Sequence, residues 1–192
     1  MKVAIQAGLL IVAAVLAYFI YDGIQQKIEF RNNAEKRRVV VQERLQKIVM
    51  AQKEFKNEKE RYAGNFDELI DFLKNDSLTI LKAIGNVPDS LTEIEAVEQG
   101  IVIRDTTQLP ASSIFEEDID VDQLRYVPFT DQKEFRLKAG EIEKNKVNVK
   151  VFEASAKLGD VYTGLNTENE NVNPDKLLKV GSMTEPITTG NW

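Results

Sequence analysis

The 192-residue chain contains no cysteine and no histidine. The absence of cysteine excludes a disulfide framework, a thiolate nucleophile and cysteine-based zinc or iron–sulfur sites. The absence of histidine removes the commonest general base and the usual partner of a nucleophilic serine, so Ser112 and Ser113 lack that activation. We therefore expect a protein that is not an enzyme and that carries no cofactor.

Proline is also scarce, with five residues, and the chain has no low-complexity tract. Apolar residues make up 43% of the sequence, which is typical of a folded chain, although the Asn- and Glu-rich residues 165–174 are expected to form a loop. The length suits one soluble domain together with a membrane segment.

The net charge of −6 is distributed unevenly. Residues 27–61 carry eleven Lys and Arg against six Asp and Glu, whereas residues 62–192 carry thirteen against twenty-four. The acidic distal part would repel phosphate, so we expect no nucleic-acid partner.

One long apolar run stands near the start of the chain. Residues 3–21 include Gln6 as their only strongly polar side chain, and a helix of this length reaches about 28 Å, close to the thickness of the hydrocarbon layer. The end of the run lacks the small residues of a signal-peptide cleavage site. The sequence predicts an uncleaved transmembrane anchor over residues 1–23, with a cleaved signal as the alternative. Tyr18, Phe19 and Tyr21 gather at one end, as residues at a membrane interface do.

The orientation of this anchor is open to two arguments. The positive-inside rule favours a cytoplasmic body, because more basic residues follow the apolar run than precede it. Those that follow are Lys27, Arg31, Lys36, Arg37 and Arg38. A periplasmic body is favoured by two other points. A long C-terminal domain can cross the membrane regardless of its charge, and a chain without cysteine is compatible with the periplasm. We expect an inner-membrane, single-pass protein with a periplasmic body. Residues 36–38 are interpreted as a solvated helix face, with docking on anionic lipid head groups as the alternative.

An amphipathic helix is predicted over residues 24–62, which are rich in helix-forming residues and contain no proline. Apolar positions at spacings of four and three form one stripe, interrupted by Gln52 and Lys59. The stripe comprises Val41, Leu45, Ile48, Phe55 and Tyr62. The interruptions favour packing of the stripe on the protein's own sheet, so we expect these residues to form a helix–sheet seam. A parallel coiled-coil dimer is the alternative.

The residues after the predicted helix 24–62 are of types that end one helix and begin another. Gly64 is expected to be a left-handed cap that ends the long helix. Asn65 is a candidate N-cap for a short helix over residues 66–73, with Glu68 three residues further on.

Residues 34–73, "AEKRRVVVQERLQKIVMAQKEFKNEKERYAGNFDELIDFL", resemble the amphipathic half of the long N-terminal helix and the turn after it in type IV pilins and type II secretion pseudopilins. Ala51, Phe55, Tyr62 and Leu69 stand at the matching places. With the apolar run included, the resemblance extends over about seventy residues. It implies a pilin-like fold and a structural role in a pilus-like or secretion-like membrane machine.

Two features of those families are not shared by this sequence. A Gly-Phe-Thr-Leu-type processing site precedes the apolar run in a typical pilin, and a glutamate lies near the start of the mature helix. Here the apolar run begins at Val3 without a Gly-Phe junction, and Gln6 stands near the place of the acid. The resemblance therefore leaves processing and filament assembly open.

Beyond the helices we expect short helices and turns over residues 63–99, including a helix at 77–84 and a turn at 86–89. An antiparallel β domain with a C-terminal loop is predicted over residues 100–192. Its strands are expected at residues 100–107, 121–129, 134–139 and 146–154, with the connections 130–133 and 140–145 between them. The predicted fold class is α+β, with a long N-terminal helix, transmembrane and then amphipathic, packed on a small antiparallel meander.

Two distal features are candidate binding sites. Glu116, Glu117, Asp118, Asp120 and Asp122 lie close together in the sequence. Asp118, Asp120 and Asp122 are candidate calcium ligands, although Gln123 stands where an EF-hand requires glycine; a solvated acidic loop is the alternative. Trp192 at the end of the chain is either a packed plug or a partner-binding residue.

These features predict a bacterial envelope protein that supports or assembles a membrane machine, with other envelope proteins and the lipid bilayer as partners. It would form a homo- or hetero-oligomer if the helix or the body associates further. The alternative function is a membrane-tethered binding module that uses the acidic, calcium-binding loop.

Overall fold

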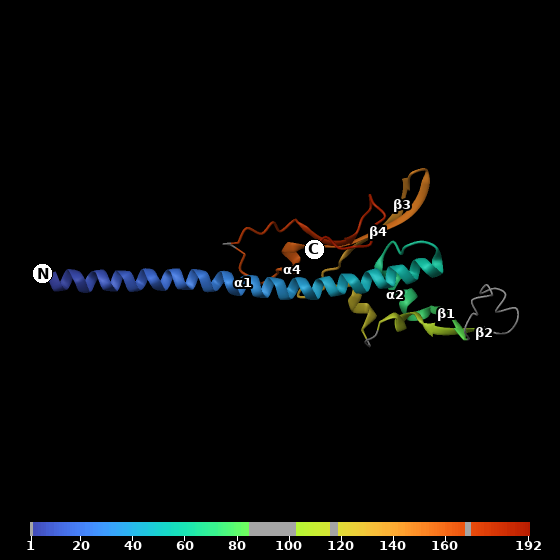
Figure 1. Ribbon diagram of the computed structural model, residues 1–192, viewed down its shortest axis with the longest axis horizontal. Helices are drawn as coiled ribbons and strands as arrows, with labels where there is room; N and C mark the ends of the chain where they lie inside the picture. The colour runs from blue at the N-terminus through green and yellow to red at the C-terminus, as the bar shows by residue number, and fades with distance from the viewer. Residues whose placement is uncertain (1, 85–102, 116–118, 168–169) are drawn as a thin grey trace, which may run out of the picture.

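The structure is a computed structural model that describes residues 2–84, 103–115, 119–167 and 170–192. It is an α+β protein with one long N-terminal helix and small antiparallel sheets. Helix α1 spans Lys2–Lys59, which at 1.5 Å per residue is about 87 Å. Figure 1 shows that the folded body gathers around the C-terminal half of α1, while the N-terminal half extends away from it. The predicted continuation of the apolar run into an amphipathic helix is confirmed.

Helix α1 ends differently from the prediction. The left-handed residue is Glu60, with φ of 57°, and its N–H donates to the carbonyl of Lys56 at 2.9 Å. Gly64 does not have a positive φ, so the predicted glycine cap is wrong. Helix α2 (Phe66–Asn75) confirms the prediction for the next element, because Asn65 Oδ1 accepts the N–H of Glu68 at 2.9 Å.

A three-stranded antiparallel sheet has the order β3-β4-β5. Strands β3 (Arg136–Lys144) and β4 (Val147–Lys157) overlap two predicted strands. The predicted loop at 140–145 is wrong, because β3 continues to Lys144 and the turn is formed by Asn145 and Lys146, both with positive φ. This two-residue turn twists in the sense that the hairpin needs. Strand β5 (Leu177–Gly181) pairs with β4 and lies in the segment predicted to be a loop.

A second sheet contains two strands, β1 (Ser77–Ile84) and β2 (Ile103–Pro110). The helix predicted at 77–84 is therefore wrong. This segment is short and carries β-branched residues such as Thr79 and Ile80, and pairing with a distant strand decides its conformation. The predicted strand 100–107 overlaps β2 in part, and the predicted turn at 86–89 lies outside the described residues.

The strand predicted at 121–129 is also wrong. A 3₁₀ helix, η2 (Val121–Arg125), occupies its first half, followed by a single β-bridge between Tyr126 and Glu134. The local reason is the side chain of Asp120, whose Oδ1 accepts the N–H of Asp122 at 3.0 Å and starts the turn. Two further short helices, η1 (Ala111–Ile114) and α4 (Leu158–Val161), connect the sheets to the rest of the body.

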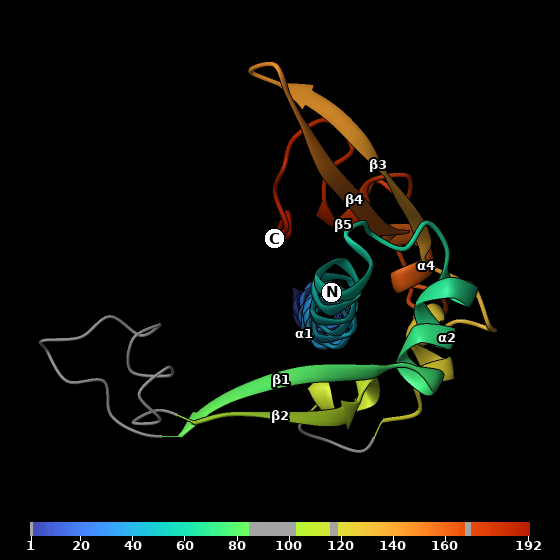
Figure 2. The same ribbon diagram turned by 90° about the vertical axis from the view of Figure 1, so that its right-hand side faces the viewer.

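Viewed along α1, the helix lies between the β3-β4-β5 sheet and the β1-β2 ribbon, with α2 beside it (Figure 2). Helix α1 contacts α2, α4, β4, β5, η1 and η2. The expected single meander on one side of the helix is therefore replaced by two separate sheets around it. This arrangement packs the body on several sides of the amphipathic half of the helix, while side chains such as Val39, Val40 and Met50 stay exposed.

The buried stripe of α1 forms the centre of the core. The side chains of Val41, Leu45, Ile48 and Phe55 are all buried, and so is that of Tyr62, which lies three residues beyond the end of α1 and not within the helix as predicted. Their partners are mixed: the Phe55 ring lies 5.1 Å from that of Phe72 on α2, and the Tyr62 ring lies 4.7 Å from that of Phe152 on β4. The stripe therefore packs on α2 as well as on the sheet.

Gln52 was expected to interrupt this stripe, and that expectation is wrong. Its side chain is fully buried, and its amide forms two hydrogen bonds with the backbone of Ala63. A buried polar group whose donor and acceptor are both satisfied is compatible with an apolar core. Lys59 is the second expected interruption. Its side chain is exposed outside the core, and its Nζ lies 2.6 Å from Oδ2 of Asp76.

Candidate membrane-interaction site

The N-terminal half of α1 exposes its apolar side chains on all sides. Every described side chain from Ile5 to Tyr21 is exposed, and that of Leu10 reaches 72%. By length and composition alone, one helix in the described part of the chain could cross a membrane, and it is this one. A soluble body would not leave such a continuous apolar surface in water, so the segment is a candidate membrane span.

The predicted interfacial aromatics lie at the end of this apolar segment. Tyr18, Phe19 and Tyr21 are exposed by 66%, 65% and 62%. The rings of Tyr18 and Phe19 meet edge to face at 6.1 Å, so these side chains contact each other rather than the body. Their position suits the amphipathic layer of a membrane, where aromatic rings with one polar end are enriched.

The basic residues that follow divide into two groups. Lys27, Arg31 and Lys36 are exposed on α1. Arg37 instead contacts the body: its Nη1 donates to the carbonyls of Val161 and Thr163, and its guanidinium lies 5.0 Å from the ring centroid of Phe129. Arg37 therefore connects α1 to two distant segments of the body.

Arg38 stays on the helix surface and pairs with Glu35 at 3.5 Å. Near it, the ring of Tyr162 packs edge to face on that of Phe30 at 5.8 Å. Burial raises the pKa of the Tyr162 hydroxyl, an effect that the nearby Arg38 opposes. These contacts show that the helix surface changes from solvent-facing to body-facing over residues 30–38.

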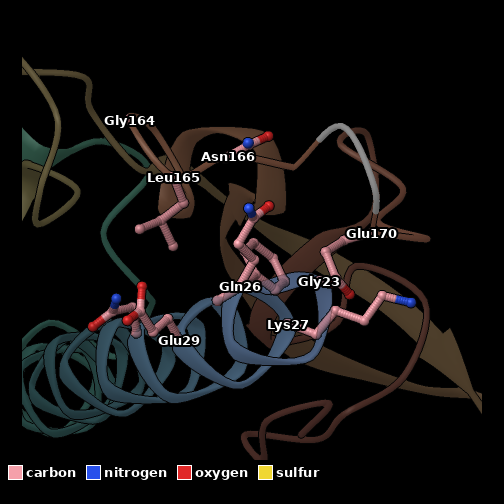
Figure 3. A pocket seen from close by; sticks show the side chains of 10 residues that line it. Gly23, Gln26, Lys27, Glu29, Gly164, Leu165, Asn166 and Glu170 are labelled. Atoms are coloured by element: carbon pink, nitrogen blue, oxygen red, sulfur yellow. The ribbon is translucent and has the colours of Figure 1, made fainter. Parts of the chain in front are cut away.

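A cleft opens where the exposed half of α1 meets the body, and we call it the junction cleft. It is lined by one side of α1 between residues 23 and 33, and by residues 164–166 with Glu170. Its volume is about 640 Å³. Figure 3 shows Gln26 and Leu165 facing each other across the cleft, with Lys27 and Glu170 towards the same end.

The lining of the junction cleft combines charges of both signs with apolar side chains. Lys27, Glu29 and Glu170 supply the charges, and Phe30 and Leu165 supply the apolar surface. Among the described residues, none of these three charged side chains forms an ion pair or hydrogen bond with another side chain. The cleft therefore holds charged groups whose partners can come from outside the chain.

The predicted calcium ligands are separated by their local contacts. Asp122 pairs with Lys74 of α2 at 2.7 Å, and Asp120 caps η2 and lies close to Arg44. Burial lowers the pKa of the Arg44 guanidinium, which donates a hydrogen bond to the Gln123 carbonyl. Asp118, with Glu116 and Glu117, lies outside the described residues. In the part of the chain that the structure describes, no three acidic side chains gather as metal ligands would.

Trp192 is partly exposed, at 42%, and its ring lies against Gly190, where an added Cβ would approach the ring to 2.2 Å. Hydrogen bonds of Asn191 hold the chain end on β5. Its N–H donates to the Lys179 carbonyl at 3.1 Å, and its Oδ1 accepts the Lys179 N–H at 3.0 Å. The terminus is thus tethered mainly by its backbone and by Asn191, and the Trp192 ring stays accessible to a partner.

Comparisons of the chain with protein-family models, with curated proteins and with solved structures gave no match.

Sequence reasoning missed the body side of the junction cleft. The sequence identifies Lys27 only as part of the basic segment, and it predicts a loop for the segment that contains Leu165 and Glu170. The helix side could have been located from the end of the apolar run. The other side is brought there by the segment that follows α4, which runs back along α1 towards its N-terminal half (Figure 1).

Proposed function

We propose that this chain is a non-enzymatic, single-pass protein of the bacterial cell envelope that serves as a structural or assembly component of a membrane machine. The observation that carries the proposal is the division of α1. One half is exposed and apolar, and the other half is the centre of the folded body. A single rigid helix therefore fixes the position of the body relative to the bilayer.

The division of α1 favours a positional role over a ligand-binding one. The helix has no proline between its two halves, so displacement of the span is transmitted to the body with little bending. The body itself packs around the helix from several sides, which prevents it from moving independently. A component built in this way holds other proteins at a set distance from the membrane.

The resemblance to pilins and pseudopilins supports a pilus-like or secretion-like machine. An exposed apolar half-helix that continues into a buried half-helix beside antiparallel strands is the layout that this resemblance implies. We propose an inner-membrane location with the body in the periplasm, where contacts to other envelope proteins would be made. The exposed Trp192 ring is a candidate contact for those proteins, and so are the acidic side chains that outnumber the basic ones over residues 62–192.

The first experiment is the intact mass of the protein purified from its native cells, combined with membrane fractionation and a carbonate wash. We expect the full mass, including residues 1–21, in the washed membrane fraction. A full-length protein released by carbonate would overturn the membrane-spanning proposal. A mass lacking the leading residues would indicate processing, and it would favour a filament subunit or a released domain.

The orientation is tested with single introduced cysteines, because the native chain has none. Lys146→Cys lies in the exposed β3-β4 turn. Intact spheroplasts treated with a membrane-impermeant maleimide should label this variant if the body is periplasmic. A cytoplasmic protein with one exposed cysteine serves as the negative control. Labelling only after lysis would place the body in the cytoplasm.

A further inference from the structure

The junction cleft lies at a defined height relative to the apolar run. If the run leaves the hydrocarbon at Tyr21, then Gly23, Gln26 and Lys27 stand about 3, 8 and 9 Å beyond it along α1. The head-group layer on each side of a bilayer is about 5 to 8 Å thick. The end of the cleft nearest the membrane, at Gly23, therefore lies within the head-group layer, and Gln26 lies at its outer limit. Lys27 lies just beyond this limit, and its flexible stem can reach back into the layer.

The charges of the cleft match a ligand that carries both signs. Lys27 offers an ammonium group that binds a phosphate, and Glu170 and Glu29 offer carboxylates that accept hydrogen bonds from an ammonium group. Figure 3 shows the Lys27 and Glu170 side chains close to the same end of the cleft, with Glu29 further along the helix. Phe30 and Leu165 add apolar surface to the lining of the same cleft.

From this geometry we propose that the junction cleft binds the head group of a phospholipid with a primary ammonium, of the phosphatidylethanolamine class. The phosphate contacts Lys27, and the ammonium donates hydrogen bonds to Glu170. This inference rests on the proposed function, because it requires the apolar run to span a bilayer. It goes further by assigning the lipid class that seats the body on the membrane surface.

The two other common head groups fit the cleft less well. Phosphatidylcholine carries a trimethylammonium group, which has no N–H to donate to Glu170. Phosphatidylglycerol carries the phosphate but no cation, so it leaves Glu170 and Glu29 without a partner beside an added negative charge. The pair of carboxylates therefore distinguishes an ethanolamine head group from a simply anionic one.

The test uses the full chain in nanodiscs that contain equal amounts of phosphatidylethanolamine, phosphatidylcholine and phosphatidylglycerol. After release into detergent, native mass spectrometry measures which lipid remains bound. We expect phosphatidylethanolamine to be retained about fivefold more than phosphatidylcholine, the size of effect that a partly exposed ion pair produces. Glu170→Gln should reduce this preference to about onefold, because the contact that distinguishes the two lipids is lost. Lys27→Gln should lower the retention of both lipids and keep the preference, because both carry the phosphate that Lys27 contacts.

Glu143→Gln is the matched control, because Glu143 is an exposed acid on β3, which projects from the end of the body away from the cleft (Figure 1). It should keep the wild-type preference. Circular dichroism of all variants checks that each remains folded, as expected for exposed or half-exposed side chains.

The outcomes separate the two proposals. Equal retention of phosphatidylethanolamine and phosphatidylcholine by the wild-type protein overturns the lipid assignment, as does a preference for phosphatidylglycerol that survives Glu170→Gln. In both cases the protein is still embedded, so the membrane-spanning proposal stands. A wild-type protein that does not enter nanodiscs at all, and that carbonate releases from native membranes, overturns both.

Discussion

The side-chain amide of Gln52 forms hydrogen bonds with both backbone groups of Ala63: Nε2 donates to the carbonyl at 2.9 Å, and the Ala63 N–H donates to Oε1 at 2.9 Å. Gln52 lies near the end of α1, and Ala63 lies in the segment that leads into α2. Both residues are fully buried. This pair of bonds fixes the path of the chain as it leaves the long helix.

The first prediction concerns this contact. Gln52→Ala leaves a buried N–H and a buried carbonyl without partners, so we expect the free energy of unfolding to fall by about 2 to 4 kcal/mol. Denaturant unfolding of the full chain in detergent micelles, followed by circular dichroism, measures the change. Gln46→Ala, an exposed glutamine on the same helix, should change it by less than about 0.5 kcal/mol. Equal effects of the two substitutions would show that the hydrogen bonds with Ala63 contribute little to the free energy of unfolding.

The sequence indicated where the stripe of α1 lies but assigned Gln52 the wrong role. Its spacing from Ile48 and Phe55 places it on the buried face. A buried glutamine destabilises the core if its amide lacks hydrogen-bond partners and is tolerated if it has them. Here the partner is the backbone of Ala63, which lies beyond the end of the helix. Helix periodicity contains no information about that partner.

The strands that sequence patterns missed share a physical cause. Strand β1 pairs with residues 103–110, and β5 pairs with β4, so each needs a partner that is distant in the chain. Strands β3 and β4, by contrast, alternate clearly and are joined by a two-residue turn. Local patterns identify a hairpin, whereas long-range pairing is decided by the whole fold.

The same contrast between local and long-range information applies to the candidate site. The apolar run and its aromatic residues are continuous in sequence, so composition and length suffice to locate them. The junction cleft requires Gly164, Leu165 and Glu170 to lie against residues 23–33 of α1. More than a hundred residues separate its two sides, and only the folded structure brings them together.

The second prediction uses two glycines that both have positive φ. Gly181 has φ of 71°, and an added Cβ would meet the carbonyl oxygen of Phe152 at 2.2 Å. Gly164 has φ of 80° and open space around it. We expect Gly164→Ala to cost about 1 to 2 kcal/mol through backbone strain alone. Gly181→Ala should cost clearly more, because the strand backbone must also shift.

Thermal unfolding of both glycine variants beside the wild-type protein measures this difference. A Gly181→Ala variant as stable as Gly164→Ala would mean that β4 and β5 are further apart than their register indicates.

The third prediction separates the two halves of α1. Leu45 is fully buried in the body, whereas Val12 is exposed in the apolar run. Leu45→Asp places an unpaired charge in the core and should unfold the body, because isolated buried charges are strongly destabilising. Val12→Asp should instead weaken membrane insertion by about 2.5 to 3.5 kcal/mol while the body stays folded.

Limited proteolysis reports the folding of the body, and carbonate extraction reports membrane insertion. The two variants should give opposite patterns in these assays. A folded body in Leu45→Asp would contradict the core position of the stripe, and normal insertion of Val12→Asp would contradict the transmembrane assignment.

The last prediction concerns acid stability. The carboxylate of Glu68 accepts hydrogen bonds from Arg61 and from the N–H of Gly64. The bond from Arg61 lowers the pKa of Glu68 below its ordinary value of 4.5 in the folded protein. The folded state therefore favours the ionised form, and this contribution is present above pH 4.5 and is lost as the pH falls through the lowered pKa. The contact is partly exposed, so we expect it to contribute less than about 1 kcal/mol.

Glu68→Gln removes the titrating group and keeps a side chain of similar size. The free energy of unfolding of the wild-type protein should fall more steeply than that of the variant as the pH is lowered below about 4.5. Glu143→Gln, which removes an exposed acid from β3, should keep the wild-type slope. Denaturant unfolding at a series of pH values compares the slopes. Parallel curves for the wild-type protein and Glu68→Gln would mean that the Arg61 contact does not persist in solution.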